Sequence, residues 1–223
     1  MGTDPRRGTG PRELADLPYA AVLQPNTSGL RPHGEYDCEH FDKLSLEDPA
    51  AASARFLECA FTNVTMRGGQ FRRARFIDVW LQDVQLVTTG LTETSWQDVT
   101  ITGAVLAGTE AYGAQLSRVT LRGCKLDSVN FRDATLTDVR LDGCLLRDVD
   151  FGGASLTRTE FTDCRLENTD LSRVTLDQVD LRGAELGIII GPDSLRGAIV
   201  TTGQLVMLAP LLAESLGITV SDS

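Results

Sequence analysis

Large and small apolar residues recur along most of this chain with a period of five residues. Every fifth residue from Phe56 to Leu186 gives 27 positions, of which sixteen are Leu, seven are Phe and only Ala111 is small. The residue two places before each of them is always Ala, Val, Thr, Cys or Gly, and the other three of each five are mostly polar. A period of five matches neither the 3.6-residue turn of a helix nor the two-residue period of a strand. The pattern therefore excludes a plain helix and a plain continuous strand as the structure of residues 56–186.

The period fits a chain that turns a corner every five residues. One large and one small residue then point inward on each side, three residues face water, and four sides close a square coil. Stacked coils pair backbone to backbone at about 4.8 Å. Eight of the positions two residues after the large one are Gly, which suits a tightly bent corner, and residues 50–191 contain no Pro. The sequence predicts an all-β solenoid of about seven coils, in which residues 20 apart stack on one another.

Individual repeats resemble a known family. The runs Val129–Asp133 and Ala134–Asp138 look like the A(D/N)LXX motif of the pentapeptide-repeat proteins, and the register from Phe56 to Leu186 covers 131 of 223 residues. This resemblance implies a right-handed quadrilateral β-helix of about 27 pentapeptides. It also implies two properties of some members: binding to DNA gyrase as mimics of duplex DNA, with resistance to fluoroquinolones or self-protection against gyrase poisons, and a two-fold dimer through a C-terminal helix and the final coils.

The flanks depart from the repeat and divide the chain into three parts. Residues 1–50 hold six of the eight prolines, and we expect an extended or mobile segment that ends in an imperfect cap on the first coil. Residues 51–190 form the repeat. Residues 191–223 contain a predicted helical cap with Thr202 as its N-cap, Gly217 as its C-cap and a kink or second short helix at Pro210. We expect one apolar side of this helix to form a homodimer interface, made of Leu205, Leu208, Leu211, Leu212 and Leu216.

Charge adds a candidate binding surface. The 31 acidic and 21 basic residues give −10, which argues against direct nucleic-acid binding. No stretch approaches 18 consecutive apolar residues and no secretory leader pattern is visible, so we expect no membrane span and a cytoplasmic location. Residues 76–117 contain no Lys or Arg and interleave acids with apolar outward positions, an arrangement that we call the acidic belt. It favours a contact surface, unless the N-terminal segment folds over it. Its expected partner-binding residues are Asp78, Trp80, Asp83, Glu93, Asp98, Glu110 and Tyr112.

The chain carries no recognisable catalytic motif. A nucleophile elbow, a phosphate-binding glycine loop, HExxH and CxxC are all absent, so we expect no enzyme activity and no cofactor. Three cysteines spaced by 20 residues stack in one inward column, where parallel side chains do not converge as zinc ligands do. They are Cys124, Cys144 and Cys164. The string from His33 to His40 holds several ligand types, but no second ligand cluster follows it. We therefore assign no metal site.

Two hypotheses for function remain open. The first is a non-catalytic protein-binding module, with DNA gyrase as the partner that the resemblance suggests. Residues 56–186 hold 19 acids and 14 bases, a net charge of −5, whereas a duplex about 30 Å long carries on the order of 18 phosphate charges. DNA mimicry would therefore need a local patch or the joined ends of a dimer. The alternative is a structural scaffold that binds an unidentified protein through its acidic and apolar face.

Overall fold

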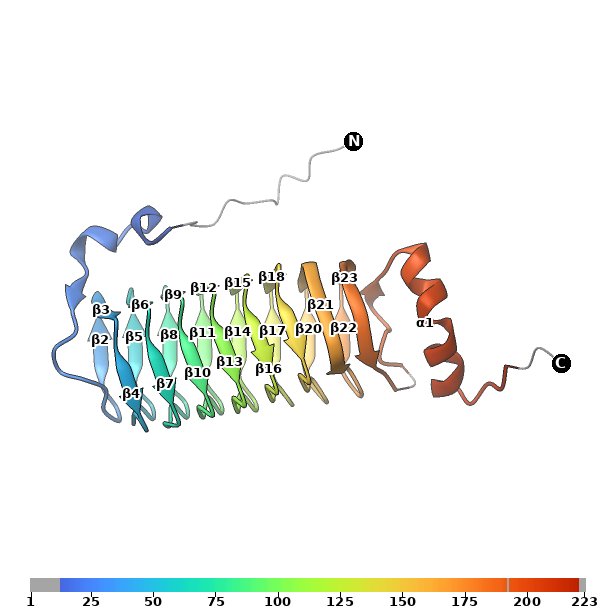
Figure 1. Ribbon diagram of the computed structural model, residues 1–223, viewed down its shortest axis with the longest axis horizontal. Helices are drawn as coiled ribbons and strands as arrows, with labels where there is room; N and C mark the ends of the chain where they lie inside the picture. Colours follow the sequence, from blue (N-terminus) through green and yellow to red (C-terminus); the bar gives the residue numbers. More distant parts are fainter. Residues whose placement is uncertain (1–12, 192, 221–223) are drawn as a thin grey trace.

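The chain winds into a solenoid of stacked coils. The computed structural model describes residues 13–191 and 193–220. Figure 1 shows the coils in a single row, with the N-terminal segment at one end and helix α1 at the other. One side of the solenoid is an eight-stranded parallel sheet with one strand from each coil. The sequence prediction of about seven coils is therefore one coil short, because the first coil already begins at Glu35, before the clear repeat.

Each coil places short strands on successive sides, and strands of neighbouring coils pair in parallel. The first side contains β2 Glu35–Asp37, β5 Arg55–Leu57, β8 Arg75–Ile77, β11 Ser95–Gln97, β14 Gln115–Ser117, β17 Thr135–Thr137, β20 Ser155–Thr157 and β22 Thr175–Asp177. The second side contains β3 Glu39–Asp42, β6 Ala60–Thr62, β9 Trp80–Gln82, β12 Thr100–Thr102, β15 Thr120–Arg122 and β18 Arg140–Asp142. The third side contains β4 Ser45–Glu47, β7 Thr65–Arg67, β10 Gln85–Val87, β13 Val105–Ala107, β16 Lys125–Asp127 and β19 Leu145–Arg147.

The last coils join the second and third sides into one sheet. Strands β21 Glu160–Asp170 and β23 Val179–Ile189 run through the corner between these sides, and the short strand β24 Ala198–Ile199 pairs with β23. The fourth side is held by isolated parallel bridges from Ala50 to Asp170. The coils are therefore linked on all four sides.

Residues that are 20 apart in the sequence stack on one another inside the solenoid, so side chains of the same kind lie in contact. Phe76 pairs with Phe56 on one side and with Trp96 on the other. The Phe76 and Trp96 rings lie parallel with their centroids 4.0 Å apart. Stacked aromatic rings and close-packed Leu columns fill the interior, so the five-residue pattern forms the core as predicted.

The corners adopt left-handed backbone conformations. Seven corner glycines have positive φ, but among the described residues so do 24 residues other than Gly, including Thr88 at 53°. The left-handed region is unfavourable for a β-branched residue such as Thr. The geometry of the coil, rather than the local preference of each residue, therefore sets the corner.

The N-terminal end is capped by residues that precede the repeat. Strand β1 Gln24–Pro25 pairs with β3, and the Gln24 amide donates to the Cys38 carbonyl oxygen at 2.8 Å. The Tyr36 hydroxyl accepts a hydrogen bond from the Arg31 amide at 2.8 Å. Two 3₁₀ helices, η1 Leu14–Asp16 and η2 Ala20–Val22, precede this cap. The described part of residues 1–50 thus contains a cap joined to a first coil, where the sequence predicted an extended or mobile segment that ends in an imperfect cap.

Helix α1 Thr202–Ser215 closes the other end. Its N-cap is Thr201 rather than Thr202, and Thr201 and Gln204 form reciprocal capping hydrogen bonds. The Gln204 amide also donates to the carbonyl oxygens of Leu181 and Ala184 at 2.7 and 2.8 Å, which ties the helix to the last coil. Pro210 lies inside one continuous helix, so of the two expected alternatives, a kink or a second short helix, the second helix does not form.

Candidate functional site

The residues of the acidic belt do not form one surface. Because 20 residues make one coil, positions 78 to 112 pass almost twice around the solenoid. Asp78 and Asp98 stack on the corner between the first and second sides, and Glu93 and Tyr112 lie beside each other near the fourth side, where the Glu93 amide donates to the Tyr112 carbonyl oxygen at 2.8 Å. The structure therefore separates the belt into two small groups, with Asp83 on a third edge. The full set of expected residues is Asp78, Trp80, Asp83, Glu93, Asp98, Glu110 and Tyr112.

Trp80 is not available to a partner. It occupies an outward position on β9, yet only 1% of its surface is exposed. Tyr19, in the N-terminal segment, is itself buried, and burial followed by the charges of nearby groups including Asp78 and Glu58 raises the pKa of its hydroxyl, which indicates that this segment lies beside the same corner. The expectation of an exposed Trp80 is wrong, and the burial of Tyr19 favours the alternative that the N-terminal segment covers this part of the belt.

Arginines from neighbouring coils neutralise two acids of the belt. Arg73 Nε lies 2.6 Å from Glu93 Oε2, and Arg72 lies 3.4 Å from the same oxygen. Arg118 contacts both carboxylate oxygens of Asp98, at 2.6 and 2.7 Å. The hydrogen bonds from Arg73 and Arg118 are the main reason that the pKa values of Glu93 and Asp98 lie below their usual range. These arginines lie outside residues 76–117, so counting charges along the chain missed them.

Three acids of the belt have no ion-pair partner among the described residues. They are Asp78, Asp83 and Glu110. Burial, followed by the charges of Asp98 and Glu58, raises the pKa of Asp78. Glu110 accepts a hydrogen bond from Asn130 Nδ2 at 2.8 Å. Only Asp83 and Glu110 therefore offer charge to a partner without first breaking an ion pair or leaving a partly buried site.

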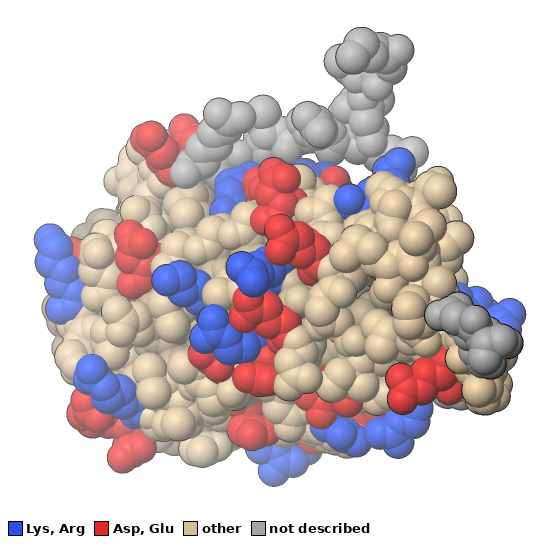
Figure 2. Space-filling view, turned by 45° about the vertical axis from the view of Figure 1, so that its right-hand side comes forward, with Lys and Arg blue, Asp and Glu red and all other residues tan. Residues whose placement is uncertain are grey.

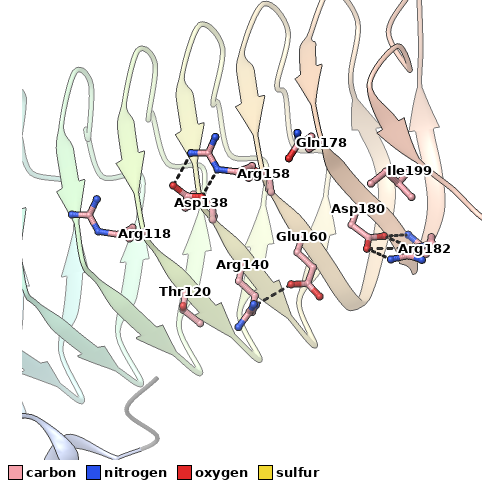
Figure 3. A pocket seen from close by; sticks show the side chains of 12 residues that line it. Arg118, Thr120, Asp138, Arg140, Arg158, Glu160, Gln178, Asp180, Arg182 and Ile199 are labelled. Carbon is pink, nitrogen blue, oxygen red and sulfur yellow. Dashed lines mark hydrogen bonds and ion pairs between the residues drawn. The ribbon is translucent and has the colours of Figure 1, made fainter. Parts of the chain in front are cut away.

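A polar groove runs along the second side beyond the N-terminal segment. Its volume is about 690 Å³. Figure 3 shows Arg140, Arg158 and Arg182 each paired with a carboxylate of the groove, whereas Arg118 pairs with Asp98 outside it. Arg158 holds Asp138 through two hydrogen bonds of 2.6 and 2.8 Å, and Arg182 holds Asp180 at 2.6 Å. Ile199, 42% exposed, borders the groove at its C-terminal end. On the face drawn in Figure 2, Lys and Arg side chains likewise lie next to Asp and Glu side chains. Charged groups that neutralise one another in this way suit docking of a polar segment more than proton transfer to a substrate.

The apolar surface at the C-terminal end is larger than one cap requires. Met207 is 77% exposed and Val206 is 69% exposed, whereas Leu208 is 2% exposed and packs on the last coil. A groove of about 630 Å³ lies between α1 and this coil, lined in part by Leu186, Met207 and Leu211. Of the five leucines expected at a dimer interface, Leu205 and Leu216 are exposed, Leu211 and Leu212 pack partly on the core, and Leu208 is inaccessible. No helix among the described residues is long and apolar enough to cross a membrane.

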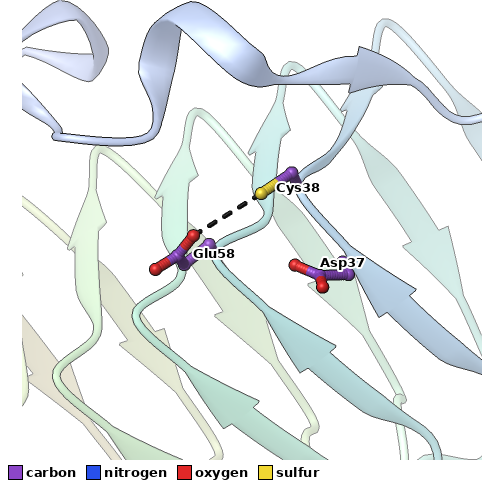
Figure 4. Close-up of side chains that lie close together, drawn as sticks. All are labelled: Asp37, Cys38 and Glu58. Atoms are coloured by element: carbon purple, nitrogen blue, oxygen red, sulfur yellow. Dashed lines mark hydrogen bonds between the residues drawn. The ribbon is translucent and has the colours of Figure 1, made fainter.

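The cysteines fall into two environments. The stacked thiols of Cys124, Cys144 and Cys164 are buried, and each points at backbone carbonyl oxygens at 3.3–3.6 Å. Such a column packs and does not converge on one point. Cys38, by contrast, lies half-buried at a corner beside Asp37 and Glu58 (Figure 4).

The repeat places the chain among known proteins. The family model for the pentapeptide repeat region matches residues 54–131, 94–171 and 114–188, which together span more than half of the chain. The chain belongs to the pentapeptide repeat family. No curated protein matches it at a significant level.

The chain is also similar to several solved pentapeptide repeat structures. HetL from Nostoc sp. strain PCC 7120, a protein involved in regulating heterocyst differentiation, is 22% identical, with a TM-score of 0.44 over 83% of this chain and 94% of HetL. A trypsin-treated R167E form of QnrB1, a plasmid-mediated fluoroquinolone resistance protein, is 21% identical, with a TM-score of 0.43 over 86% of this chain and 98% of QnrB1. A pentapeptide repeat protein from the Arabidopsis thaliana thylakoid lumen is 14% identical, with a TM-score of 0.39 over 59% and 87%.

In this pentapeptide repeat protein, outward residues that are 20 apart in the sequence are neighbours in space. Comparing such residues would have revealed contacts that are not visible between adjacent residues in the sequence. The column through Asp98 continues to Arg118, and the column through Cys38 continues to Glu58. The cover over Trp80 has no such signal, because residues 13–22 lie outside the repeat.

Proposed function

We propose that this protein is a non-catalytic protein-binding module that self-associates through its C-terminal end. The exposed apolar residues at this end carry the proposal. Large exposed hydrophobic side chains concentrate on and after helix α1: Leu205, Val206, Met207, Leu216, Ile218 and Val220. A contiguous apolar surface of this kind is typical of an interface. Since side chains fill the interior of the coils, binding must use the outer surface.

The self-association that we propose is a homodimer joined at the two α1 ends. The groove of about 630 Å³ beside α1 would receive exposed side chains from the second copy. Light scattering after size exclusion tests this directly: we expect a dimer for the parent chain and a monomer for Met207→Glu with Val206→Glu. Thr137→Glu, on the outer face of β17, is the matched control and should leave the dimer intact. A monomeric parent chain at micromolar concentration would end the dimer proposal.

For the partner, we propose DNA gyrase as the leading candidate. The resemblance of the repeat to gyrase-binding members supports it. The length of the dimer also supports it. Two copies of eight coils each, at about 4.8 Å per coil, make a rod of roughly 77 Å. Duplex DNA of that length carries on the order of 45 phosphates. The dimer would bear twice the −10 of one chain, which is under half of that charge. Mimicry would therefore be local and would use the unpaired acids Asp83 and Glu110.

A supercoiling assay with purified gyrase tests this partner. We expect the protein to inhibit supercoiling or to relieve fluoroquinolone-stabilised cleavage, with an effect that weakens steeply as salt rises. Asp83→Lys with Glu110→Lys should remove the effect without lowering the melting temperature, because neither carboxylate is in an ion pair. The conservative pair Asp83→Glu with Glu110→Asp should keep it.

The polar groove on the second side favours a second candidate, a scaffold that docks a polar segment of another protein. In that case gyrase activity would not respond at any concentration. Partner binding would then survive the charge reversals at Asp83 and Glu110 but fail with Ile199→Asp at the rim of the groove. The five free thiols suit a reducing compartment, and we place either activity in the cytoplasm.

A further inference from the structure

The last coil leaves part of its sheet edge without a strand partner. Strand β23 pairs with β21 from Asp180 to Ile189. On its other side, within the part of the chain that the structure describes, β23 pairs only with β24, and only at Val179 and Asp180. Residues 185–189 therefore lie at the end of the sheet. An open strand edge presents N–H and C=O groups that another strand can pair with.

Helix α1 covers only the beginning of this edge. The Gln204 side chain donates to the carbonyl oxygens of Leu181 and Ala184, which occupies the part of the coil before residue 185. Farther along, Leu186 and Gly187 line the groove of about 630 Å³ between the coil and the helix. The groove therefore brings an apolar side chain and the open strand edge to the same place.

The chain after α1 has the composition of a strand but is not paired as one. Gly217, with a φ of 71°, ends the helix, and the Ile218 amide donates back to the Ala213 carbonyl oxygen at 2.8 Å. The β-branched residues Ile218, Thr219 and Val220 follow, and the two apolar side chains are more than half exposed. Figure 1 shows this segment leading away from the solenoid rather than along its own last coil.

Contact between two α1 helices alone would make a small interface. A stable interface uses about 20–30 residues from each side. Helix α1 has 14 residues, and Leu208, Leu211 and Leu212 already pack on the core of their own copy. A homodimer at this end therefore needs further contacts, and the exposed segment that continues from the helix is placed to supply them.

We propose that Ile218–Val220 of each copy pairs as a strand with the open edge of β23 in the second copy. This inference rests on the homodimer proposed above and names what joins the two copies. Three residues is the length of most strands in the solenoid. Ile218 and Val220 enter the groove beside Leu186, Thr219 faces solvent, and the backbone supplies hydrogen bonds to the edge. Two-fold symmetry makes the exchange reciprocal, so each copy gives one strand and receives one.

Hydrogen exchange at single backbone amides tests the pairing. Alternate residues of a strand direct their amides to opposite sides, so either Thr219 or Val220 donates to the edge. In the dimer, we expect exchange at that amide to be at least about tenfold slower than in the monomeric variant Val206→Glu with Met207→Glu. Exchange within residues 185–189 should slow with it. If both amides exchange in a dimer as fast as in the monomer, the pairing is wrong and the homodimer still stands.

Removing the two apolar side chains tests their contribution to affinity. Ile218→Gly with Val220→Gly also lowers the strand propensity of the segment. In sedimentation of a dilution series, we expect the dissociation constant of the dimer to rise at least about tenfold, because the burial of two apolar side chains is lost. The matched control Val22→Gly removes an exposed apolar side chain from the N-terminal segment and should leave this constant unchanged.

The outcomes separate this inference from the proposed function on which it rests. An unchanged dissociation constant in the double glycine variant overturns the strand exchange and leaves a dimer that is joined by α1. A parent chain that stays monomeric at micromolar concentration overturns the strand exchange together with the homodimer.

Discussion

Ala111 leaves a gap in a core that is otherwise filled by large side chains. It is the one small residue among the 27 large positions from Phe56 to Leu186, and its neighbours in the column are Leu91 and Phe131. A void of about 30 Å³ lies in this part of the interior, enclosed by apolar side chains including Leu91, Ala111 and Phe131. The substitution Ala111→Leu restores the residue most common in the register.

The structure sets the magnitude of the effect. At about 24 cal/mol per Å³, removing a 30 Å³ void contributes about 0.7 kcal/mol. Burying the added carbons contributes about 0.8 kcal/mol each, or about 2.4 kcal/mol for the three that Leu adds. Leu needs more room than the void offers, and overpacking costs about 1–3 kcal/mol. We therefore expect a net gain of about 1 kcal/mol in the free energy of unfolding.

Urea denaturation measures this gain as a higher midpoint at an unchanged slope. The matched opposite change is Leu91→Ala, which enlarges the same void and should cost about 3–5 kcal/mol. A fall in stability for Ala111→Leu would refute the reasoning, because it would mean that the neighbours have already closed around the alanine. A cost below about 1 kcal/mol for Leu91→Ala would refute it from the other side.

Three further predictions concern the register, a corner and an ion pair. Leu136→Asp places a charge inside a coil and should lower the free energy of unfolding by more than about 3 kcal/mol. Thr137→Arg on the outer face should change it by about 0.5 kcal/mol or less. Equal effects of the two variants in thermal melts would contradict the register. Thr88→Gly should raise the free energy of unfolding, measured by urea denaturation, by about 0.5–1 kcal/mol, because Thr88 has a φ of 53°. A fall in this free energy would show that the Thr88 side chain contributes more than its backbone strain costs. Arg158 lowers the pKa of Asp138, so their pair stabilises the fold above the unfolded pKa of about 3.8 and is lost as pH falls through the folded value. The melting-temperature difference between the parent chain and Arg158→Gln should therefore shrink between pH 5 and pH 3, and a constant difference would argue against the pair.

The inward residues were predictable because each one is set by a local rule repeated many times. Phe56, Phe76 and Trp96 must stack if the chain turns every five residues, and the structure places them so. The same rule gives the burial of Cys124 without any knowledge of its neighbours. Packing of this kind depends only on position within the coil.

The outward residues were less predictable because their environment depends on other coils and on the flanks. Glu93 and Asp98 look unpaired along the chain, but Arg73 and Arg118 reach them from the coils before and after. Trp80 looks exposed in the register, yet only 1% of its surface is exposed. The candidate surface was therefore only partly visible in the sequence, whereas the core was almost fully visible.

The 20-residue column also limits how such a chain can change in length. An insertion or deletion of five residues keeps every large and small position pointing inward, so the core survives. The same change rotates all later coils by a quarter turn relative to the earlier ones. A change between Asp98 and Arg118 would separate this ion pair, and a change between Cys124 and Cys144 would divide the cysteine column between two sides. A change of 20 residues, by contrast, removes or adds one whole coil and leaves each outward column intact, so outer surfaces on this protein can be inherited only in steps of a full coil.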